Sequence, residues 1–170
     1  MRGWPRAVES VSASLTLSAV GAAALALGVL VYLTDRGAAS APLIPSIDVL
    51  GGADLFGAAA AWLPSFLHPL AFILFTAAVA LPSASPPYWT CLLWLAIDVM
   101  FEAGQLPAAS ERFSSLAREV TDPTGGLVAI ARYLQNGTYD PADIAATVGG
   151  VLVAGVVLHV VLRRRKGDEL

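Results

Sequence analysis

Apolar stretches alternate with short polar segments along this chain of 170 residues. Four stretches are apolar and long enough to predict membrane-spanning helices, at residues 11–33, 59–81, 88–104 and 144–162. A helix needs about 20 apolar residues to cross a hydrocarbon core of about 30 Å. The pattern predicts an all-α, polytopic membrane protein: a bundle of about four transmembrane helices in a single membrane domain over residues 1–170.

The first stretch allows a second interpretation, because the small residues 37–41 that follow it could be cleaved by a signal peptidase. The apolar core of a signal peptide has only about 7–15 residues. Residues 11–33 form a longer run, which favours a retained helix. A cleaved signal peptide stays the alternative.

The connection at residues 106–141 carries most of the charge that lies away from the termini. Within this connection, a short surface helix is predicted at residues 111–120. Apolar residues recur at helical spacing in residues 126–135, which predicts a helix lying flat on the membrane. Gly137 is expected to end that helix. The external loops are therefore expected to contain short interfacial helices.

Basic residues indicate how the chain is oriented in the plasma (inner) membrane. Arg2, Arg6 and the basic run at residues 163–166 flank the first and last stretches. Positively charged flanks stay in the cytoplasm. The rule predicts that both termini are cytoplasmic, and that the connections at residues 34–58 and 106–141 lie outside.

Composition narrows the class of protein further. Hydrophobic residues make up 56% of the chain and charged residues 14%, against about 25% charged in soluble domains. No basic patch of the kind that binds nucleic acid is present. The single cysteine, Cys91, excludes an intramolecular disulfide and a cysteine-rich zinc site.

The third stretch carries polar residues where a membrane helix should be apolar. Asp98, Glu102 and Gln105 are spaced i, i+4, i+7 and therefore share one stripe of a helix. An ionised carboxylate near the middle of a membrane costs about 2.5–3.5 kcal/mol on insertion scales. The stripe must face protein, water or a ligand, which makes it a candidate functional site.

Other polar residues are expected at the same depth. The second and fourth stretches run inward, so His68, Asp140 and Asp143 reach the level of the stripe near the outer surface. A histidine among carboxylates suits proton transfer. Oxygen ligands from Glu102, Asp140 and Asp143 would also suit a divalent cation such as Mg²⁺ or Ca²⁺. The alternative is a hydrogen-bonded network that joins the helices.

The start of the fourth stretch has a purely structural interpretation as well. Pro141 and Asp143 are typical of a first helical turn, and Asp140 of the residue before it. Under that interpretation both acids are helix caps. Small residues within the stretch are expected to allow close helix packing: Gly149, Gly150 and Gly155.

Three segments resemble the VanZ-like membrane family: LPSFLHPLAF, the Glu102-Ala-Gly-Gln105 motif and GTYDPADIAATVGG. That family is marked by a His early in one span, E-x-x-Q at the end of the next, and D-x-x-D before a Gly-rich last span. The resemblance covers roughly residues 60 to 155 in order and spacing. It places these residues at the family positions: His68, Glu102, Gln105, Asp140, Asp143 and Gly150. This chain has Asn136-Gly137 where the family often has Arg, and Thr147 where it often has Asn.

The resemblance implies a function at the cell envelope, because the founding member is associated with resistance to the glycopeptide teicoplanin. One hypothesis is an enzyme that acts on an envelope lipid or glycan precursor, with His68, Glu102 and Asp143 as candidate catalytic residues. The second is a non-catalytic scaffold or binding partner. A transporter is weaker, because four spans form a thin pathway unless the chain is a homo-oligomer. The candidate ligand-binding residues are Asp98, Gln105, Tyr139 and Asp140.

Overall fold

The computed structural model describes residues 4–36, 53–81, 87–121 and 125–167, and their secondary structure is entirely helical. The prediction of an all-α fold is confirmed. The helices are α1 (Trp4–Val31), continued by the π-turn η1 (Tyr32–Arg36), the 3₁₀ turn η3 (Gly57–Ala61), α2 (Leu63–Ala80), α3 (Trp89–Gly104), α4 (Pro107–Val120), α5 (Gly126–Asn136) and α6 (Pro141–Gly167). The candidate signal-peptidase site at residues 37–41 lies outside the described residues.

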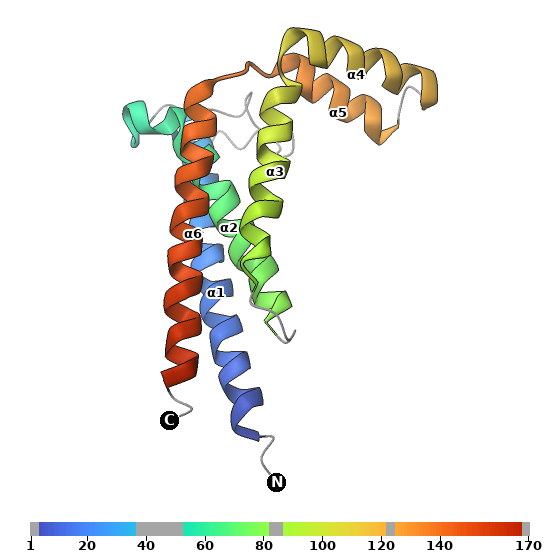
Figure 1. Cartoon of the computed structure of the whole chain (residues 1–170). Helices are drawn as coiled ribbons and strands as arrows, with labels where there is room; N and C mark the ends of the chain where they lie inside the picture. Colours follow the sequence, from blue (N-terminus) through green and yellow to red (C-terminus); the bar gives the residue numbers. More distant parts are fainter. Residues whose placement is uncertain (1–3, 37–52, 82–86, 122–124, 168–170) are drawn as a thin grey trace.

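Helices α1, α2, α3 and α6 run along the long axis of the molecule (Figure 1). Helices α1 and α3 run in one direction and α2 and α6 in the other, so α1 begins and α6 ends at the same end of the bundle (Figure 1). Helices α4 and α5 lie across the opposite end. Helix α2 is central, because it packs against α1, α3 and α6. Half of its apolar span is buried, against 22% for α1 and 28% for α6.

Within the described residues, three helices are long and apolar enough to cross a membrane by themselves: Val11–Asp35, Leu63–Ala80 and Pro141–Arg164. Helix α3 has 16 residues and is roughly 24 Å long. It passes the same test only together with α4, across a bend of 93°. The predicted count of four spans therefore holds only if this bent pair counts as one of them.

The bend between α3 and α4 follows from local sequence. Leu106 is extended, with φ −58° and ψ 134°. A residue before proline is disfavoured in the helical region, and proline is preferred at the first position of a helix. Pro107 therefore ends α3 and begins α4, which starts four residues earlier than the surface helix predicted at residues 111–120.

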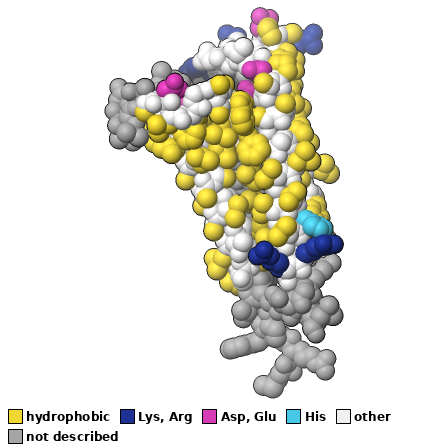
Figure 2. Space-filling model, turned by 90° about the vertical axis from the view of Figure 1, so that its left-hand side faces the viewer, with side chains coloured by type: hydrophobic (Ala, Val, Ile, Leu, Met, Phe, Trp, Pro, Cys, Tyr) yellow, Lys and Arg dark blue, Asp and Glu magenta, His cyan; other side chains and the backbone are white. Residues whose placement is uncertain are grey.

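The apolar surface agrees with membrane insertion. Figure 2 shows one face with apolar side chains through the middle and charged side chains toward the two ends. Large exposed apolar side chains include Leu15, Leu92 and Leu152. Soluble proteins rarely expose such continuous apolar surface. The chain therefore has the surface of a membrane protein.

Glycines allow α2 and α6 to approach closely. A Cβ at Gly150 would lie 2.1 Å from the carbonyl oxygen of Phe66, and a Cβ at Gly149 would lie 3.3 Å from the Phe66 ring. The predicted packing through small residues is confirmed at these two positions. The prediction is wrong for Gly155, where an added Cβ would meet no atom within 4 Å.

Asp35 connects the end of the first helix to the η3 turn. Its carboxylate accepts hydrogen bonds from the backbone N–H groups of Leu55, Phe56 and Gly57, the shortest being 2.8 Å from Phe56. The hydroxyl of Thr34 donates to the same carboxylate. These bonds hold η3 beside η1, at the end of the bundle where the polar residues of α2 and α3 lie.

Candidate polar pocket

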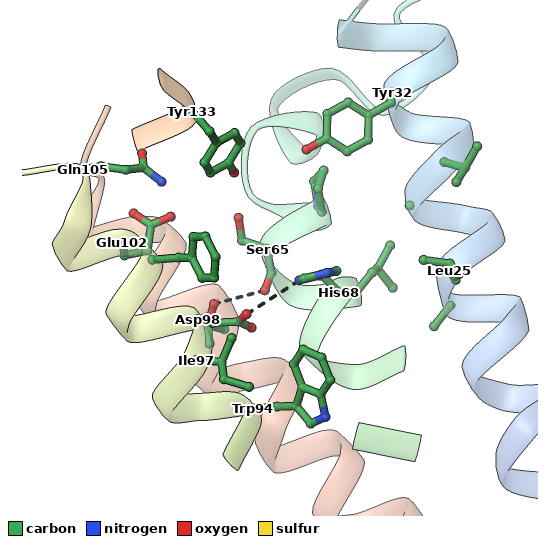
Figure 3. Close-up of a pocket in the computed structure, with 17 residues that line it drawn as sticks. Leu25, Tyr32, Ser65, His68, Trp94, Ile97, Asp98, Glu102, Gln105 and Tyr133 are labelled. Atoms are coloured by element: carbon green, nitrogen blue, oxygen red, sulfur yellow. Dashed lines mark hydrogen bonds and ion pairs between the residues drawn. The ribbon is translucent and has the colours of Figure 1, made fainter. Parts of the chain in front are cut away.

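A pocket of about 470 Å³ lies between α1 and α3, with α2 behind it (Figure 3). Its walls come mainly from these three helices, and Tyr133 of α5 and Thr147 of α6 complete it. Pockets that bind small molecules have volumes of about 300–1,000 Å³. The space is therefore large enough for a ligand.

The predicted stripe of α3 faces this pocket. Asp98, Glu102 and Gln105 all line it, as the i, i+4, i+7 spacing predicts. Apolar residues of the opposite face, such as Leu92 and Met100, are exposed on the outside of the bundle. The helix therefore separates a polar inner face from an apolar outer face.

His68 of α2 points toward the stripe from the neighbouring wall (Figure 3). Its Nδ1 atom lies 3.7 Å from Oδ1 of Asp98, a distance for an ion pair rather than a hydrogen bond. The Asp98 side chain is 12% exposed and the His68 side chain 52%. The His68 ring meets Phe72 edge-on at a centroid distance of 4.5 Å. The predicted convergence of His68 with the acids of α3 is present in the fold.

Two carboxylate oxygens in the pocket are buried without a hydrogen-bond partner among the described residues: Oδ2 of Asp98 and Oε2 of Glu102. Asp98, Asp140 and Asp143 all lie close enough to Glu102 to interact with its charge. Burying a polar atom without a partner is unfavourable, and like charges add to that cost. Both residues line the pocket, so a rotation of either side chain would bring its unpartnered oxygen within reach of a bound molecule.

The acids that begin α6 make structural contacts. Oδ1 of Asp140 accepts the backbone N–H of Ala142 at 2.8 Å, which is a helix-capping bond. Oδ1 of Asp143 accepts the hydroxyl of Ser65 at 2.7 Å, and Thr147 donates to the Ser65 carbonyl oxygen at 3.2 Å. These bonds join α6 to α2 at the pocket wall, to which Ser65 and Thr147 belong. Capping thus accounts for Asp140, whereas Asp143 also links two helices.

Asp140, Asp143 and Tyr139 are not among the residues that line the pocket in the described structure. Their predicted roles in ligand binding or catalysis stay predictions. The described part of the chain contains no group of three or more His, Cys, Asp or Glu residues that could hold a metal ion. The proposed cation site at Glu102, Asp140 and Asp143 therefore has no geometric support there.

Gly137 makes room for Gln105. A Cβ at Gly137 would lie 2.3 Å from Oε1 and 2.5 Å from Cδ of the Gln105 side chain. Gly137 ends α5 as predicted, but with φ −76° and ψ 159° it is extended and not left-handed. This glycine is therefore required for space rather than for an unusual backbone conformation.

Four aromatic residues of the pocket were not predicted from the sequence: Tyr32, Trp94, Phe101 and Tyr133. Trp94 lies one turn before Asp98 on the same stripe, so the spacing could have identified it. Its Nε1 donates to the hydroxyl of Thr76 at 2.9 Å, which fixes the ring. The sequence does not predict that Tyr32 and Tyr133 line the pocket, because no polar stripe marks the inward face of the helices that carry them.

Tyr133 lies over the pocket from α5, where its ring meets Phe101 at a centroid distance of 6.2 Å. Burial raises the pKa of the Tyr133 hydroxyl, and the nearby Tyr32 and Glu102 raise it further. Tyr133 therefore keeps its proton well above neutral pH and can donate a hydrogen bond toward the pocket.

Comparisons with protein-family models, curated proteins and solved structures gave no significant match. The assignment of a function therefore starts from the geometry of the pocket and from the sequence motifs.

Proposed function

We propose that this chain is a multi-pass membrane protein whose pocket recognises or acts on the polar part of a cell-envelope lipid, glycan or glycopeptide. The observation that carries this proposal is that Asp98 and Glu102 line a space of about 470 Å³ and each has one buried oxygen without a partner among the described residues. A network that serves stability alone normally satisfies its polar atoms. Unpartnered acids in the wall of a cavity are better explained by a ligand with hydrogen-bond donors.

The resemblance to the VanZ-like family supports this proposal, because its motif residues His68, Glu102 and Gln105 all line the pocket. The basic run at residues 163–166 favours cytoplasmic termini in the plasma membrane. In that orientation the pocket lies toward the outer leaflet, because α1 begins and α6 ends at the other end of the bundle (Figure 1). A site at that depth is accessible to envelope components.

Proton transfer is the chemistry that this pocket could support. Asp98 would orient His68, and Glu102 would exchange a proton with a bound hydroxyl or amine. Glu102 lies one turn above Asp98 on α3, so both groups can contact one ligand. Recognition without catalysis requires the same contacts.

A non-catalytic scaffold is the second candidate, and a separate observation favours it. The bonds of Ser65 to Asp143 and Thr147 join α2 to α6 and require no ligand. Under this alternative, the polar residues would position the helices for a partner protein in the membrane. The two candidates predict different effects of removing the pocket acids: loss of a bound ligand in the first, and loss of stability in the second.

The test compares wild type with the Asp98→Asn/Glu102→Gln double variant and with Glu111→Gln, an acid on the exposed surface of α4. Each protein is purified from its own membrane, and co-purifying lipids and glycans are identified by native mass spectrometry. A ligand site predicts that the double variant folds and loses a bound molecule that both other proteins retain. In cells, only the double variant should lose an effect on teicoplanin susceptibility.

The proposal is wrong if all three proteins carry the same bound molecules. The scaffold is favoured if, in addition, the double variant unfolds at a much lower temperature than wild type. Breaking a satisfied structural network costs about 3–5 kcal/mol for a buried charge pair, which such a measurement readily detects.

A further inference from the structure

The pocket opens sideways, between two helices that do not pack together. Helix α1 packs against α2 and α6, and α3 packs against α2, α4 and α6, whereas α1 and α3 have almost no direct contact in the described part of the chain. Figure 3 shows α1 and α3 on opposite sides of the pocket, with α2 behind. In a membrane this opening would face lipid rather than water.

The rim of the opening is apolar and exposed. Leu25 and Val29 line it from α1 and Phe101 from α3, and each of these side chains is about two-fifths exposed. They continue the apolar outer surface of the bundle into the pocket. Hydrocarbon chains can therefore contact the rim without crossing a polar barrier.

The pocket is apolar at one end and polar at the other, as a lipid is apolar in its chain and polar in its headgroup. Trp94 and Ile97 lie at one end, and Glu102, Gln105 and Tyr133 lie at the other (Figure 3). From Trp94 to Gln105 the α3 wall rises roughly 16 Å. The apolar end lies deeper in the bundle and the polar end lies beside α5. A lipid with its chain toward the middle of the membrane would match this gradient.

The charge of the walls selects among lipid headgroups. The lining residues contain the acids Asp98 and Glu102, and none of the described lining residues is Lys or Arg. Carboxylates repel phosphate groups and accept hydrogen bonds from hydroxyl and ammonium groups. Among the described lining residues, His68 alone has a side chain that can become positive, and it already faces Asp98. The walls therefore favour a headgroup that donates hydrogen bonds.

We propose that the gap between α1 and α3 is a lateral port, through which a membrane lipid with a hydroxyl- or ammonium-bearing headgroup reaches Asp98 and Glu102. This inference rests on the proposed function, because it names the class of ligand and its route. Sugars and amines share this chemistry, so the test must separate them.

The test uses three photoreactive probes in nanodiscs of phosphatidylcholine. The probes share one alkyl chain with a diazirine and differ in the headgroup, which is glucose, ammonium or phosphate. Labelled residues are mapped by mass spectrometry. We expect labelling of the pocket walls by the glucose or the ammonium probe at about ten times the level of the phosphate probe, and the stronger of the two identifies the source.

Blocking variants test the route. A Cβ at Gly28 would meet Leu67 at 3.9 Å, an ordinary contact, so the rest of the side chain in Gly28→Leu must extend into the pocket. Gly155→Leu is the matched control, because an added Cβ there meets open space. Labelling should fall about tenfold in Gly28→Leu and stay unchanged in the control.

A second pair keeps the test valid if Gly28→Leu does not fold. Leu25 and Leu27 are both 38% exposed on α1, but only Leu25 lines the pocket. Leu25→Trp should reduce labelling and Leu27→Trp should not. If a pocket variant and its control both fold and are labelled equally, lipids do not enter through this gap. If the phosphate probe labels most strongly, the headgroup assignment is wrong.

A parallel measurement separates this inference from the proposed function. Methyl glucoside and ethylamine carry the headgroups without a chain, and their binding is read as a rise in the Tm of wild type that the Asp98→Asn/Glu102→Gln variant does not show. If they raise the Tm of wild type alone while no alkyl probe labels the pocket, the pocket binds polar ligands and the lateral port is wrong. If neither class of probe binds, both proposals are wrong.

Discussion

Replacing Glu102 by glutamine should stabilise the protein, because the substitution keeps the shape of the side chain and removes an unfavourable charge. One oxygen of this carboxylate is buried without a partner among the described residues. Three further acids interact with its charge: Asp98, Asp140 and Asp143. In wild type, burial and these repulsions oppose the Glu102 charge, and the hydrogen bond from the backbone of Asp140 offsets only part of them.

The size of the effect follows from these two terms. A buried polar atom without a hydrogen bond costs about 1–3 kcal/mol, and the amide of glutamine keeps part of that cost. Removing the charge should therefore raise the free energy of unfolding by about 1–2 kcal/mol. For a chain of this length, about 1 kcal/mol shifts Tm by about 2–4 °C, so we expect a rise of about 2–8 °C.

Thermal unfolding of detergent-solubilised protein, followed by tryptophan fluorescence, measures this shift. Glu111→Gln on the exposed surface of α4 is the control and should stay within about 0.5 kcal/mol of wild type. In acid, where the wild-type carboxyl is neutral, Glu102→Gln and wild type should converge. If Glu102→Gln lowers Tm while Glu111→Gln does not, the carboxylate stabilises the fold and the reasoning for a ligand site is wrong.

Two glycine substitutions test the packing around the pocket. Gly137→Ala should turn the flexible Gln105 side chain out of the pocket and weaken ligand binding with little loss of Tm. In a Gln105→Ala background, Gly137→Ala should weaken binding no further. If it weakens binding there as much as in wild type, Gly137 does not act through Gln105. Gly150→Ala places a Cβ against the backbone of Phe66, which cannot move aside, and should destabilise by about 1–3 kcal/mol in the same unfolding assay. The control Gly155→Ala should be neutral or gain up to about 1 kcal/mol, and equal effects of the two alanines would refute the close contact of α2 with α6.

The polar stripe of α3 could be predicted because it depends only on helical periodicity. Asp98 and Glu102 stand out within an apolar run, and their spacing decides that they share a face. The depth of His68 could be predicted in the same way, from its position along its own helix. Depth does not determine which way a side chain points: Tyr139 and Asp140 lie in the segment before α6 and were expected in the pocket, but neither lines it in the described structure.

Features that depend on contacts between helices could not be predicted from the sequence. The requirement for glycine at position 137 comes from Gln105, which lies 32 positions earlier in the chain. Pro107 predicts that α3 ends and the chain bends there, but the sequence alone does not give the angle of 93°. The same limit applies to Tyr133, which belongs to the pocket only because α5 folds back over α3.

The core and the pocket occupy different parts of α2, which explains how the fold tolerates unsatisfied acids. After His68, α2 contributes a continuous buried face that includes Leu70, Ile73, Leu74 and Ala77, and packs against α1 and α6. A buried leucine or isoleucine contributes about 1.5–3 kcal/mol, so a few of them exceed the cost of one unpaired carboxylate oxygen. The packed half of α2 can therefore stabilise the fold while the acids in the polar half stay unpaired. If those acids were fully hydrogen-bonded within the protein, they could not accept hydrogen bonds from a ligand.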